Sequence, residues 1–490
     1  MKFITRIIRL SLIILLLMPS LNIPAKSIKN NNDIFDGKGD IFANQALLST
    51  VFEKLYNLEN NKQGKINIVH IGDSHIQADF FTNAIREALQ LKFGNGGFGF
   101  TFPYRLVRTN GTSRVKYICN ASWQSLLNVY PVADVGVGLS GIALYTSAED
   151  FVLQLYTEEG YEFSNVKIIY PTVEPHYRMS VTADPLEVSS SGTVTASTIG
   201  MRYHTVKSGE GLYGISRKYG VTITQIKNAN GLKSNLIKPK QRLKIPVKAG
   251  ARSTKLVQTK ASTSNIEKDS IDYVNLETKP YYSSYTSDTL LNRITILPAD
   301  KQAMYNLNGF VIENDKPGVI YHSIGVNGAK LSDYNKYPLF FEQLPILQPD
   351  LVILSFGTNE SFGRLSQTEY IYQVQEFIEN IKKLNPFATV LVMTPPPSMF
   401  RNRRINTYII DYSDALMGMN NVPVWDLYTR MGGASGIAPK GQYARMIARD
   451  KVHYTTGGYQ AQGELFASDF IDAYNNYKKN IKIEDTVEHK

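Results

Sequence analysis

The stretch from Ile66 to Asp79, INIVHIGDSHIQAD, decides how this chain folds. An apolar run stops at the tetrapeptide Gly72–His75, and Phe80 to Leu91 then has the apolar spacing of an amphipathic helix. This order predicts a strand, a tight turn and a helix. The turn places Ser74 beyond the strand end, beside the unpaired N–H groups of a helix N-terminus. Ser74 is therefore a candidate nucleophile, and a Gly-Asp-Ser turn without chemistry is the alternative interpretation.

The C-terminal part of the chain repeats the alternation of strands and helices. Buried-type strands are expected over 351–356, 389–393 and 422–427, and helices over 43–58, 369–384 and 459–477. Strands that alternate with helices imply a parallel sheet with helices on both faces. The sequence therefore predicts an α/β fold for both ends of the chain.

Between these α/β segments the sequence has β texture, from about Arg114 to Thr198 and again from Arg293 to His322. Short runs of alternating apolar and polar residues are separated by turn residues, which predicts a β-sandwich-like module in two parts. Strands are expected over 142–145, 151–156, 166–170, 179–182, 293–297, 305–312 and 318–322. The glycine-rich stretch Gly94–Gly99 lacks the Lys and Ser/Thr of a phosphate-binding loop, and we interpret it as a loop near the active-site rim.

A segment with a pattern of its own interrupts the β texture at residues 203–247. It opens with YHTVKSGEGLYGISRKYGV, continues with TITQIKNANGL and ends with IKPKQRLKIP. The pattern predicts a strand, helices over 211–219 and 222–228, and a closing strand over 241–245. The segment resembles a LysM module along its full length, through Tyr203–Val206, Ser208–Glu210, Asn228–Asn230 and Leu243–Pro246. LysM modules bind N-acetylglucosamine-containing glycans, usually peptidoglycan, and the resemblance implies that partner here.

Composition and charge limit the classes of protein to consider. With 490 residues, 43% hydrophobic and 20% charged, the chain is globular and should hold about three domains. The segment from Arg202 to Lys260 holds fourteen Lys/Arg and the single acid Glu210, so its net charge is +13. The whole chain has a net charge of +10, so the remainder carries about −3. Export argues against a nucleic-acid partner. Anionic wall polymers or a membrane surface are the candidate partners, and a solvated basic face is the alternative.

The N-terminus reads as an export signal. Lys2, Arg6 and Arg9 precede an apolar region from Leu10 to Met18, and cleavage is expected after Ala25. The apolar region is shorter than the ~20 residues that a spanning helix needs, so no stable membrane insertion is expected after cleavage. These features predict an exported protein of the periplasm or cell envelope. The single cysteine, Cys119, excludes an intramolecular disulfide.

Acyl transfer from an ester needs a nucleophile, a base, an orienter for the base and oxyanion donors. Asp450 and His453 stand in ARDKVHYTTGGY, where Asp450 could hold one ring nitrogen of His453 while the other faces Ser74. A surface Asp and a capping His are the alternative. Asn359 in SFGTNES and Gly328 in SIGVNGAK each follow a strand end, where a side-chain amide and a backbone N–H could donate to an oxyanion. Plain turn residues are the alternative for both.

In chain order, four blocks resemble the SGNH (GDSL-type) esterase/lipase family: Gly72–His75, Gly328, Gly357–Glu360 and Asp450-x-x-His453. The resemblance covers about 67–104 and 321–477 and implies a flavodoxin-like parallel sheet. It also implies roles for particular residues: nucleophile Ser74, oxyanion donors Gly328 and Asn359 beside the Ser74 N–H, and triad partners Asp450 and His453, with Gly325 the alternative to Gly328.

One departure narrows the resemblance further. His75 stands where many members carry Leu, but IGDSHIQADFF and GVNGA resemble the bacterial peptidoglycan O-acetylesterase branch, which also inserts a β-module after the first block. The expected boundaries are a signal peptide at 1–25, hydrolase at 43–113 and 319–480, β-rich module at 114–200 and 273–318, LysM at 202–247 and linker at 248–272.

The predicted function is an exported serine esterase that removes O-acetyl groups from cell-wall glycan, with peptidoglycan preferred. One alternative is an O-acetyltransferase or a deacetylase of another exported glycan, and another is a non-catalytic peptidoglycan-binding protein. No cofactor or metal is expected, because the spacing of His75, His204 and His322 suits no metal site. The sequence does not indicate an oligomeric state.

Overall fold

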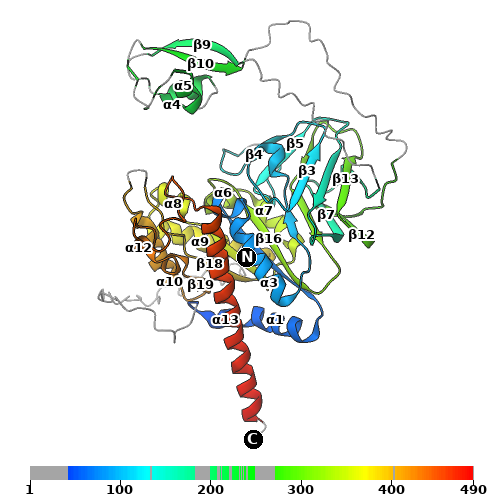
Figure 1. Cartoon of the computed structure of the whole chain (residues 1–490). Helices are drawn as coiled ribbons and strands as arrows, with labels where there is room; N and C mark the ends of the chain where they lie inside the picture. The colour runs from blue at the N-terminus through cyan, green and yellow to red at the C-terminus, as the bar shows by residue number, and fades with distance from the viewer. Residues whose placement is uncertain are drawn as a thin grey trace, which may run out of the picture. The chain divides into compact units, whose positions relative to one another are not determined.

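We describe the fold from a computed structural model (Figure 1). The described residues are 42–132, 135–182, 199–206, 210, 212–219, 223–230, 232, 234, 237–238, 241–248, 271–400 and 403–488. The predicted signal peptide at 1–25 and nearly all of the predicted linker at 248–272 lie outside them. Among the described residues, no helix combines the length and the apolar character that crossing a membrane requires.

Five parallel strands form the sheet at whose end Ser74 lies. They are β1 (Lys65–Gly72), β16 (Gly318–Gly325), β17 (Leu351–Ser355), β18 (Thr389–Met393) and β19 (Val424–Trp425). Their order across the sheet is β16-β1-β17-β18-β19, which is the flavodoxin-like order 2-1-3-4-5 when the strands are counted along the chain. The predicted fold class is confirmed.

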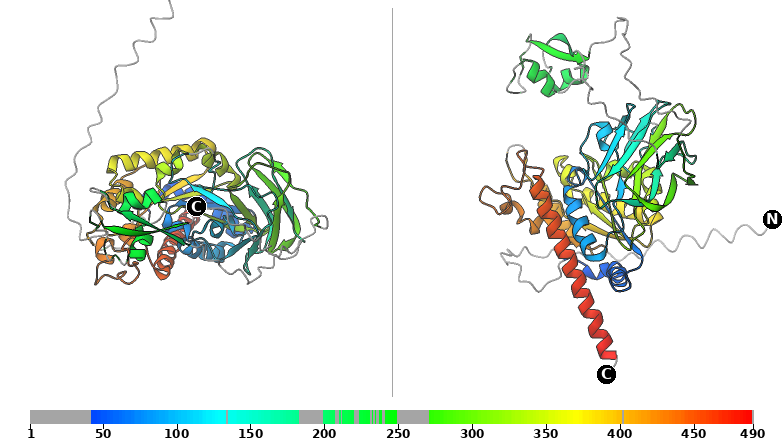
Figure 2. Two further views of the ribbon diagram at one scale, coloured as in Figure 1. Left: turned by 90° about the horizontal axis from the view of Figure 1, so that it is seen from above. Right: turned by 45° about the vertical axis from the view of Figure 1, so that its right-hand side comes forward.

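Helices cover both faces of this sheet. Alternate side chains of β1 point to opposite faces and pack against different helices. Ile66 and Ile68 belong to one buried cluster with α1 (Ser49–Asn61), α3 (Phe80–Phe93) and α13 (Thr456–Glu488). Val69 and Ile71 belong to a second cluster, with α6 (Leu331–Asn335), α7 (Pro338–Gln343), α9 (Gln367–Leu384) and α10 (Thr407–Met417). Helices α3 and α13 lie side by side in all views (Figures 1 and 2).

Short helices connect these elements. They are η1 (Gln45–Leu48), α2 (Ser74–Gln77), η2 (Tyr104–Val107), η4 (Leu344–Leu347), α8 (Thr358–Phe362), α11 (Leu427–Arg430) and α12 (Gly433–Gly436). Both α2 and α8 start within three residues after a strand of the parallel sheet ends. The helix N-termini that follow β1 and β17 are therefore at the carboxyl edge of the sheet, which is where open α/β sheets bind their ligands.

The β-rich module consists of three antiparallel sheets, ordered β11-β12-β7-β15-β2, β3-β6-β13-β8 and β14-β5-β4. Its strands are β2 (Gly99–Thr101), β3 (Val115–Cys119), β4 (Gln124–Leu127), β5 (Ile142–Thr146), β6 (Leu153–Thr157), β7 (Phe163–Ile169), β8 (Tyr177–Ser180), β11 (Glu277–Lys279), β12 (Tyr282–Leu291), β13 (Arg293–Pro298), β14 (Tyr305–Leu307) and β15 (Gly309–Glu313). Strand β2 lies within the segment predicted as hydrolase but pairs with β15. Strand β16 continues the expected β texture but belongs to the parallel sheet.

The expectation that Gly94–Gly99 lies near the active-site rim is wrong. Gly96 N donates to Val319 O at 3.2 Å, and Val319 N donates to Gly94 O at 2.9 Å, so this loop lies beside the first residues of β16. Ser74 follows the other end of the sheet, where Gly72 pairs with Gly325. At about 3.3 Å per residue, the two ends of β16 are roughly 20 Å apart.

The LysM segment has a two-stranded sheet of its own. Strands β9 (Ile199–Thr205) and β10 (Arg242–Lys248) pair antiparallel, and α4 (Leu212–Tyr219) and α5 (Ile223–Asn230) lie between them in the chain. This is the predicted βααβ order. A separate small core holds these elements together, made of Val206, Leu212, Ile215, Ile226, Leu243 and Ile245.

A buried ion pair fixes the start of α3. Arg86 Nη2 lies 2.9 Å from Asp79 Oδ1 and its Nη1 lies 3.1 Å from Asp79 Oδ2, and Arg86 Nε donates to Tyr321 O at 3.1 Å. The Arg86 side chain is fully buried. The pair therefore ties α3 to β16, which lies beside β1, the strand that leads to Ser74.

We expect Asp79→Ala to lower the free energy of unfolding by about 3–5 kcal/mol, because it leaves the Arg86 charge buried without its partner. Urea unfolding monitored by circular dichroism measures this. The matched control is Lys54→Ala, which breaks an ion pair to Asp350 whose lysine is 44% exposed and should cost less than about 1 kcal/mol. Equal losses for the two variants would contradict the role given to the buried pair.

Candidate active site

Ser74 is the first residue of α2, directly after the turn that ends β1. Asp73 caps this helix: its Oδ1 accepts the N–H of His75 at 2.9 Å. A side chain at Gly72 would lie 2.7 Å from Ser355 O and 2.5 Å from Ile76 Cγ1, so only glycine fits there. The close packing at Gly72 lets the chain turn from strand into helix within two residues. Ser74 is thereby held at the carboxyl edge of the sheet.

The structure brings Ser74, His453 and Asp450 together. Ser74 Oγ lies 2.8 Å from His453 Nε2, and His453 Nδ1 lies 2.7 Å from Asp450 Oδ2. Asp450 Oδ1 also accepts the backbone N–H groups of Val452 and His453, both at 3.0 Å. Burial alone would raise the pKa of Asp450, but these hydrogen bonds from His453 and Val452 bring that pKa below its usual value. The carboxylate is thus charged and aimed at the imidazole.

A pocket of about 450 Å³ opens in front of Ser74. It is lined by Ser74, Ala78, Phe80, Asn110, Asn327, Gly328, Thr358, Asn359, Val452, His453 and Tyr459. Gly328 has φ +83°, a conformation that favours glycine. Within the part of the chain that the structure describes, the backbone N–H groups of Ser74 and Gly328 donate to no protein acceptor. Both groups are therefore available to a ligand oxygen.

Gly325, the alternative to Gly328, is not among the residues that line this pocket. It ends β16, and its carbonyl accepts the hydroxyl of Tyr104 at 3.1 Å. A Cβ at Gly325 would lie 2.4 Å from Gln77 N. Its lack of a side chain therefore lets α2 pack directly on the strand end, and Gly328 is the glycine that faces the pocket.

Asn359 lines the pocket, but its amide is already engaged. Its Nδ2 donates to Asp73 Oδ2 at 2.9 Å and to Ala329 O at 3.0 Å. An amide nitrogen carries two hydrogens, so both are in use. Donation from Asn359 to an oxyanion requires one of these bonds to open. The sequence placed Asn359 at the right strand end but gave no sign of these acceptors.

Two buried carboxyl groups lie behind Asn359. Burial raises the pKa of Asp73, and the nearby Glu360 carboxyl adds to this rise, while hydrogen bonds from His75 and Asn359 lower the pKa; the net value is about 8. Burial also raises the pKa of Glu360 to about 7, although its oxygens accept the N–H groups of Leu331 and Gly357 at 2.8 and 3.0 Å. Both groups accept hydrogen bonds that hold the loops around the site.

The other histidines have separate partners. His75 Nδ1 lies 2.9 Å from the Tyr459 hydroxyl, and burial together with the nearby His453 lowers the pKa of His75 to about 3. His322 Nδ1 accepts the N–H of Phe100 at 3.0 Å, and His204 Nε2 lies 2.8 Å from Glu210 Oε2. Among the described residues, no three His, Cys, Asp or Glu side chains are arranged to hold a metal ion.

Several pocket residues were not singled out from the sequence. Phe80, Asn110, Asn327 and Tyr459 line the pocket, and buried Gln77 lies behind it. Two of them carried a positional signal: Gln77 is three residues after Ser74 on the same helix, and Asn327 directly precedes Gly328. Asn110 and Tyr459 come from loops and helices whose position relative to the site depends on the whole fold.

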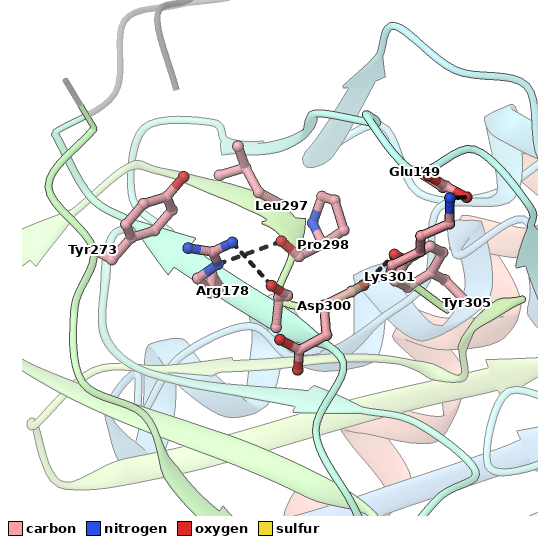
Figure 3. Close-up of a pocket in the computed structure, with 9 residues that line it drawn as sticks. Glu149, Arg178, Tyr273, Leu297, Pro298, Asp300, Lys301 and Tyr305 are labelled. Atoms are coloured by element: carbon pink, nitrogen blue, oxygen red, sulfur yellow. Dashed lines mark hydrogen bonds and ion pairs between the residues drawn. The ribbon is translucent and has the colours of Figure 1, made fainter. Parts of the chain in front are cut away.

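A second pocket, of about 330 Å³, lies in the β-rich module (Figure 3). Arg178 Nη2 donates to Ala299 O at 2.9 Å, and its guanidinium lies 4.9 Å from the Tyr273 ring centre. Lys301 pairs with Glu149 at 3.1 Å at one side of the pocket. None of the candidate catalytic residues lines this pocket.

Two parts of the chain match known domain families. Residues 305–461 match the GDSL-like Lipase/Acylhydrolase family, and residues 204–246 match the LysM domain. The first match spans about a third of the chain and contains Gly328, Asn359, Asp450 and His453, but Ser74 lies outside it. The chain therefore carries a GDSL-like acylhydrolase domain and a LysM domain. These matches confirm the predicted resemblance and the predicted enzyme class, a carboxylic ester hydrolase.

The solved structures include one with the same fold over most of the chain. It is a peptidoglycan O-acetylesterase structure that is 18% identical, with a TM-score of 0.57, over 89% of this chain and 99% of that one.

Relatives in sequence match over shorter stretches. N-acetylmuramoyl-L-alanine amidase sle1 of Staphylococcus epidermidis is 37% identical over 100 residues, which is 20% of this chain and 30% of the amidase. The Staphylococcus haemolyticus amidase of the same name is 57% identical over 42 residues, 9% of this chain and 13% of that protein. The chain thus spans less than a third of the length of these relatives.

The raised pKa values of Asp73 and Glu360 predict how stability changes with pH. Each folded-state pKa lies above the usual value, so the folded state binds protons that the unfolded chain has released. These two groups should therefore lower the free energy of unfolding as the pH rises from about 4 to 8, by at most about 1.4 kcal/mol per pH unit for each group. The buried His70, His75 and His322 have lowered pKa values and act in the opposite direction below about pH 6.5. The contribution of Glu360 is therefore measured as the difference between the wild type and Glu360→Gln, by urea unfolding at pH 5, 6, 7 and 8.

Glu360→Gln should make the decline with pH shallower, even though it lowers stability at every pH by removing one hydrogen-bond acceptor. The matched control is Glu369→Gln at the start of α9, because hydrogen bonds from Ser366 lower the pKa of Glu369 and place its effect below pH 5. The same change of stability between pH 5 and 8 in the wild type and in Glu360→Gln would contradict the raised pKa of Glu360.

Proposed function

We propose that this protein is an exported serine esterase that removes O-acetyl groups from a cell-wall glycan, with peptidoglycan as its substrate. The observation that carries the proposal is the chain of contacts from Ser74 Oγ to His453 Nε2 (2.8 Å) and from His453 Nδ1 to Asp450 Oδ2 (2.7 Å). A nucleophile, a base within hydrogen-bond reach and an orienter for the base are the requirements of acyl transfer.

In the proposed first step, Ser74 Oγ attacks the acetyl carbonyl carbon while His453 Nε2 takes the serine proton. The carbonyl oxygen becomes an oxyanion, which the backbone N–H groups of Ser74 and Gly328 stabilise. The C–O bond to the sugar then breaks, and His453 returns the proton to the sugar oxygen. Asp450 stabilises the imidazolium through Nδ1.

In the second step, His453 takes a proton from water as the water oxygen attacks the acetyl-serine carbonyl carbon. The bond to Ser74 Oγ breaks, the proton passes to Ser74, and acetate leaves. Asn359 would add a third oxyanion donor if the growing negative charge draws one amide hydrogen away from Ala329 O, to which it now donates at 3.0 Å.

Three further observations support a wall glycan as the substrate. Ala78 and Phe80 form an apolar wall in a pocket of about 450 Å³, which suits a short acyl group on a bulky polar carrier. The LysM domain match implies binding to N-acetylglucosamine-containing glycan. The structure with the same fold is a peptidoglycan O-acetylesterase, and the relatives in sequence are N-acetylmuramoyl-L-alanine amidases.

We expect Ser74→Ala to lower kcat/KM for p-nitrophenyl acetate by about 10³-fold or more, because it removes the nucleophile. Ser287→Ala, in β12 of the β-rich module, is the matched control and should leave the rate unchanged. Purified walls then test the substrate: acetate should be released from O-acetylated peptidoglycan and not from the same material after base treatment. A wild-type protein no faster than Ser74→Ala on both substrates would rule out the esterase.

The LysM domain should matter for insoluble walls only. Binding to the wall raises the local concentration of substrate without new contacts in the active site. A soluble oligomer of N-acetylglucosamine should therefore slow acetate release from walls several-fold and leave p-nitrophenyl acetate hydrolysis unchanged. A maltose oligomer is the control. Equal inhibition of both reactions would mean that the sugar acts at the active site and not at the LysM domain.

A further inference from the structure

We propose that Gln77 is a positioning residue that holds the Gly328 loop, residues 326–330 between β16 and α6, against the helix that carries Ser74. The inference rests on the proposed esterase function. Gln77 is the last residue of α2, and Ser74 is the first, so one helical turn carries both the nucleophile and the residue that holds the loop. The Gln77 side chain is 2% exposed, which makes its polar contacts internal to the fold.

The Gln77 amide joins two loops. Its Oε1 accepts the backbone N–H of Asn327, the residue before Gly328, at 2.7 Å. Its Nε2 donates towards Thr109 Oγ1 at 2.8 Å, Asn110 O at 2.7 Å and Asn110 Oδ1 at 2.8 Å. Three acceptors share two hydrogens. Displacing this buried amide is costly, because it would leave donors or acceptors buried without a hydrogen-bond partner and away from water.

Asn327 closes the network from the other side. Its Nδ2 donates to Thr109 Oγ1 at 3.1 Å and to Asn110 Oδ1 at 2.8 Å. We call these four residues the amide clamp: Gln77, Thr109, Asn110 and Asn327. The clamp links α2, the loop after η2 and the loop after β16. Two of its members, Asn110 and Asn327, line the pocket in front of Ser74.

The clamp sets the distance between the two backbone donors of the oxyanion site. The Gly328 loop has its own turn, in which Ala329 N donates to Val326 O at 3.0 Å, but this bond does not reach α2. Gly325 has no side chain, so the start of the loop lies directly against Gln77 N. The bond from Asn327 N–H to Gln77 then fixes the loop one residue before Gly328.

Removing the clamp should affect the transition state more than substrate binding, because an oxyanion exists only in the transition state and the tetrahedral intermediate. Loss of one oxyanion donor costs about 10²–10³ in kcat. We expect Gln77→Leu, which has a similar size and no polar atoms, to lower kcat for p-nitrophenyl acetate by about 10–100-fold. KM should change by less than about 3-fold.

Gln90 offers a matched control, because it contacts the start of β16 whereas Gln77 contacts the loop that follows the end of β16. It is also buried, and its Nε2 donates to Gly97 O at 2.8 Å and Val319 O at 3.0 Å. Gln90→Leu should lower Tm about as much as Gln77→Leu and leave kcat within about 2-fold of the wild type. This comparison separates loss of stability from loss of positioning.

Gln77→Glu tests the clamp without removing the acceptor for Asn327 N–H. Its kcat should lie between the wild type and Gln77→Leu, and this variant decides the question if Gln77→Leu does not fold. A wild-type kcat in both Gln77 variants, or an effect on KM alone, would overturn the clamp while leaving the esterase intact. A wild type without esterase activity would instead overturn the proposed function, and the clamp with it.

Discussion

The hydrogen bond between Ser74 Oγ and His453 Nε2 joins residues that are 379 positions apart. It forms only because the fold brings these two residues together. Ser74 is fixed by β1, which lies between β16 and β17 in the sheet. His453 is fixed by a local turn, in which Ala448 N donates to His453 O at 2.7 Å and Asp450 accepts two backbone N–H groups. Each partner is therefore held by its own local structure. The bond forms because β1 and α13, which follows His453, pack in one buried cluster.

The long insertion between α3 and β16 does not disturb this geometry, because its first and last strands, β2 and β15, pair with each other. The chain leaves the hydrolase after α3 and comes back through β15, which ends at Glu313, only a few residues before β16 begins at Gly318. The β-rich module shares one buried cluster with the second face of the parallel sheet. Buried Gln343 strengthens that contact: its Oε1 accepts Leu139 N at 2.8 Å and its Nε2 donates to Tyr170 O at 3.0 Å.

Local sequence pattern predicted the elements of this fold well, and it failed where pairing depends on distant residues. The strand before Ser74 and the helix after it follow from apolar spacing, and Asp450 and His453 follow from a three-residue turn. No local pattern says that β2 pairs with β15, or that the loop at Gly94 lies at the far end of β16. The same limit applies inside the site. The residue type of Asn359 suggests a donor, but only the fold reveals that Asp73 and Ala329 already accept its hydrogens.

The buried carboxyl of Asp73 illustrates how such a site can be organised without opposing its own chemistry. An ionised carboxylate this close to Ser74 would repel a developing oxyanion, and the repulsion would be strong because the group is buried. Burial raises the pKa of Asp73 to about 8, so near neutral pH the charge is largely absent. A neutral carboxyl still accepts hydrogen bonds. Asp73 can therefore cap α2 through His75 N and hold Asn359 at 2.9 Å while adding little negative charge beside the oxyanion. The desolvation that makes the group expensive to ionise is what makes it compatible with the site.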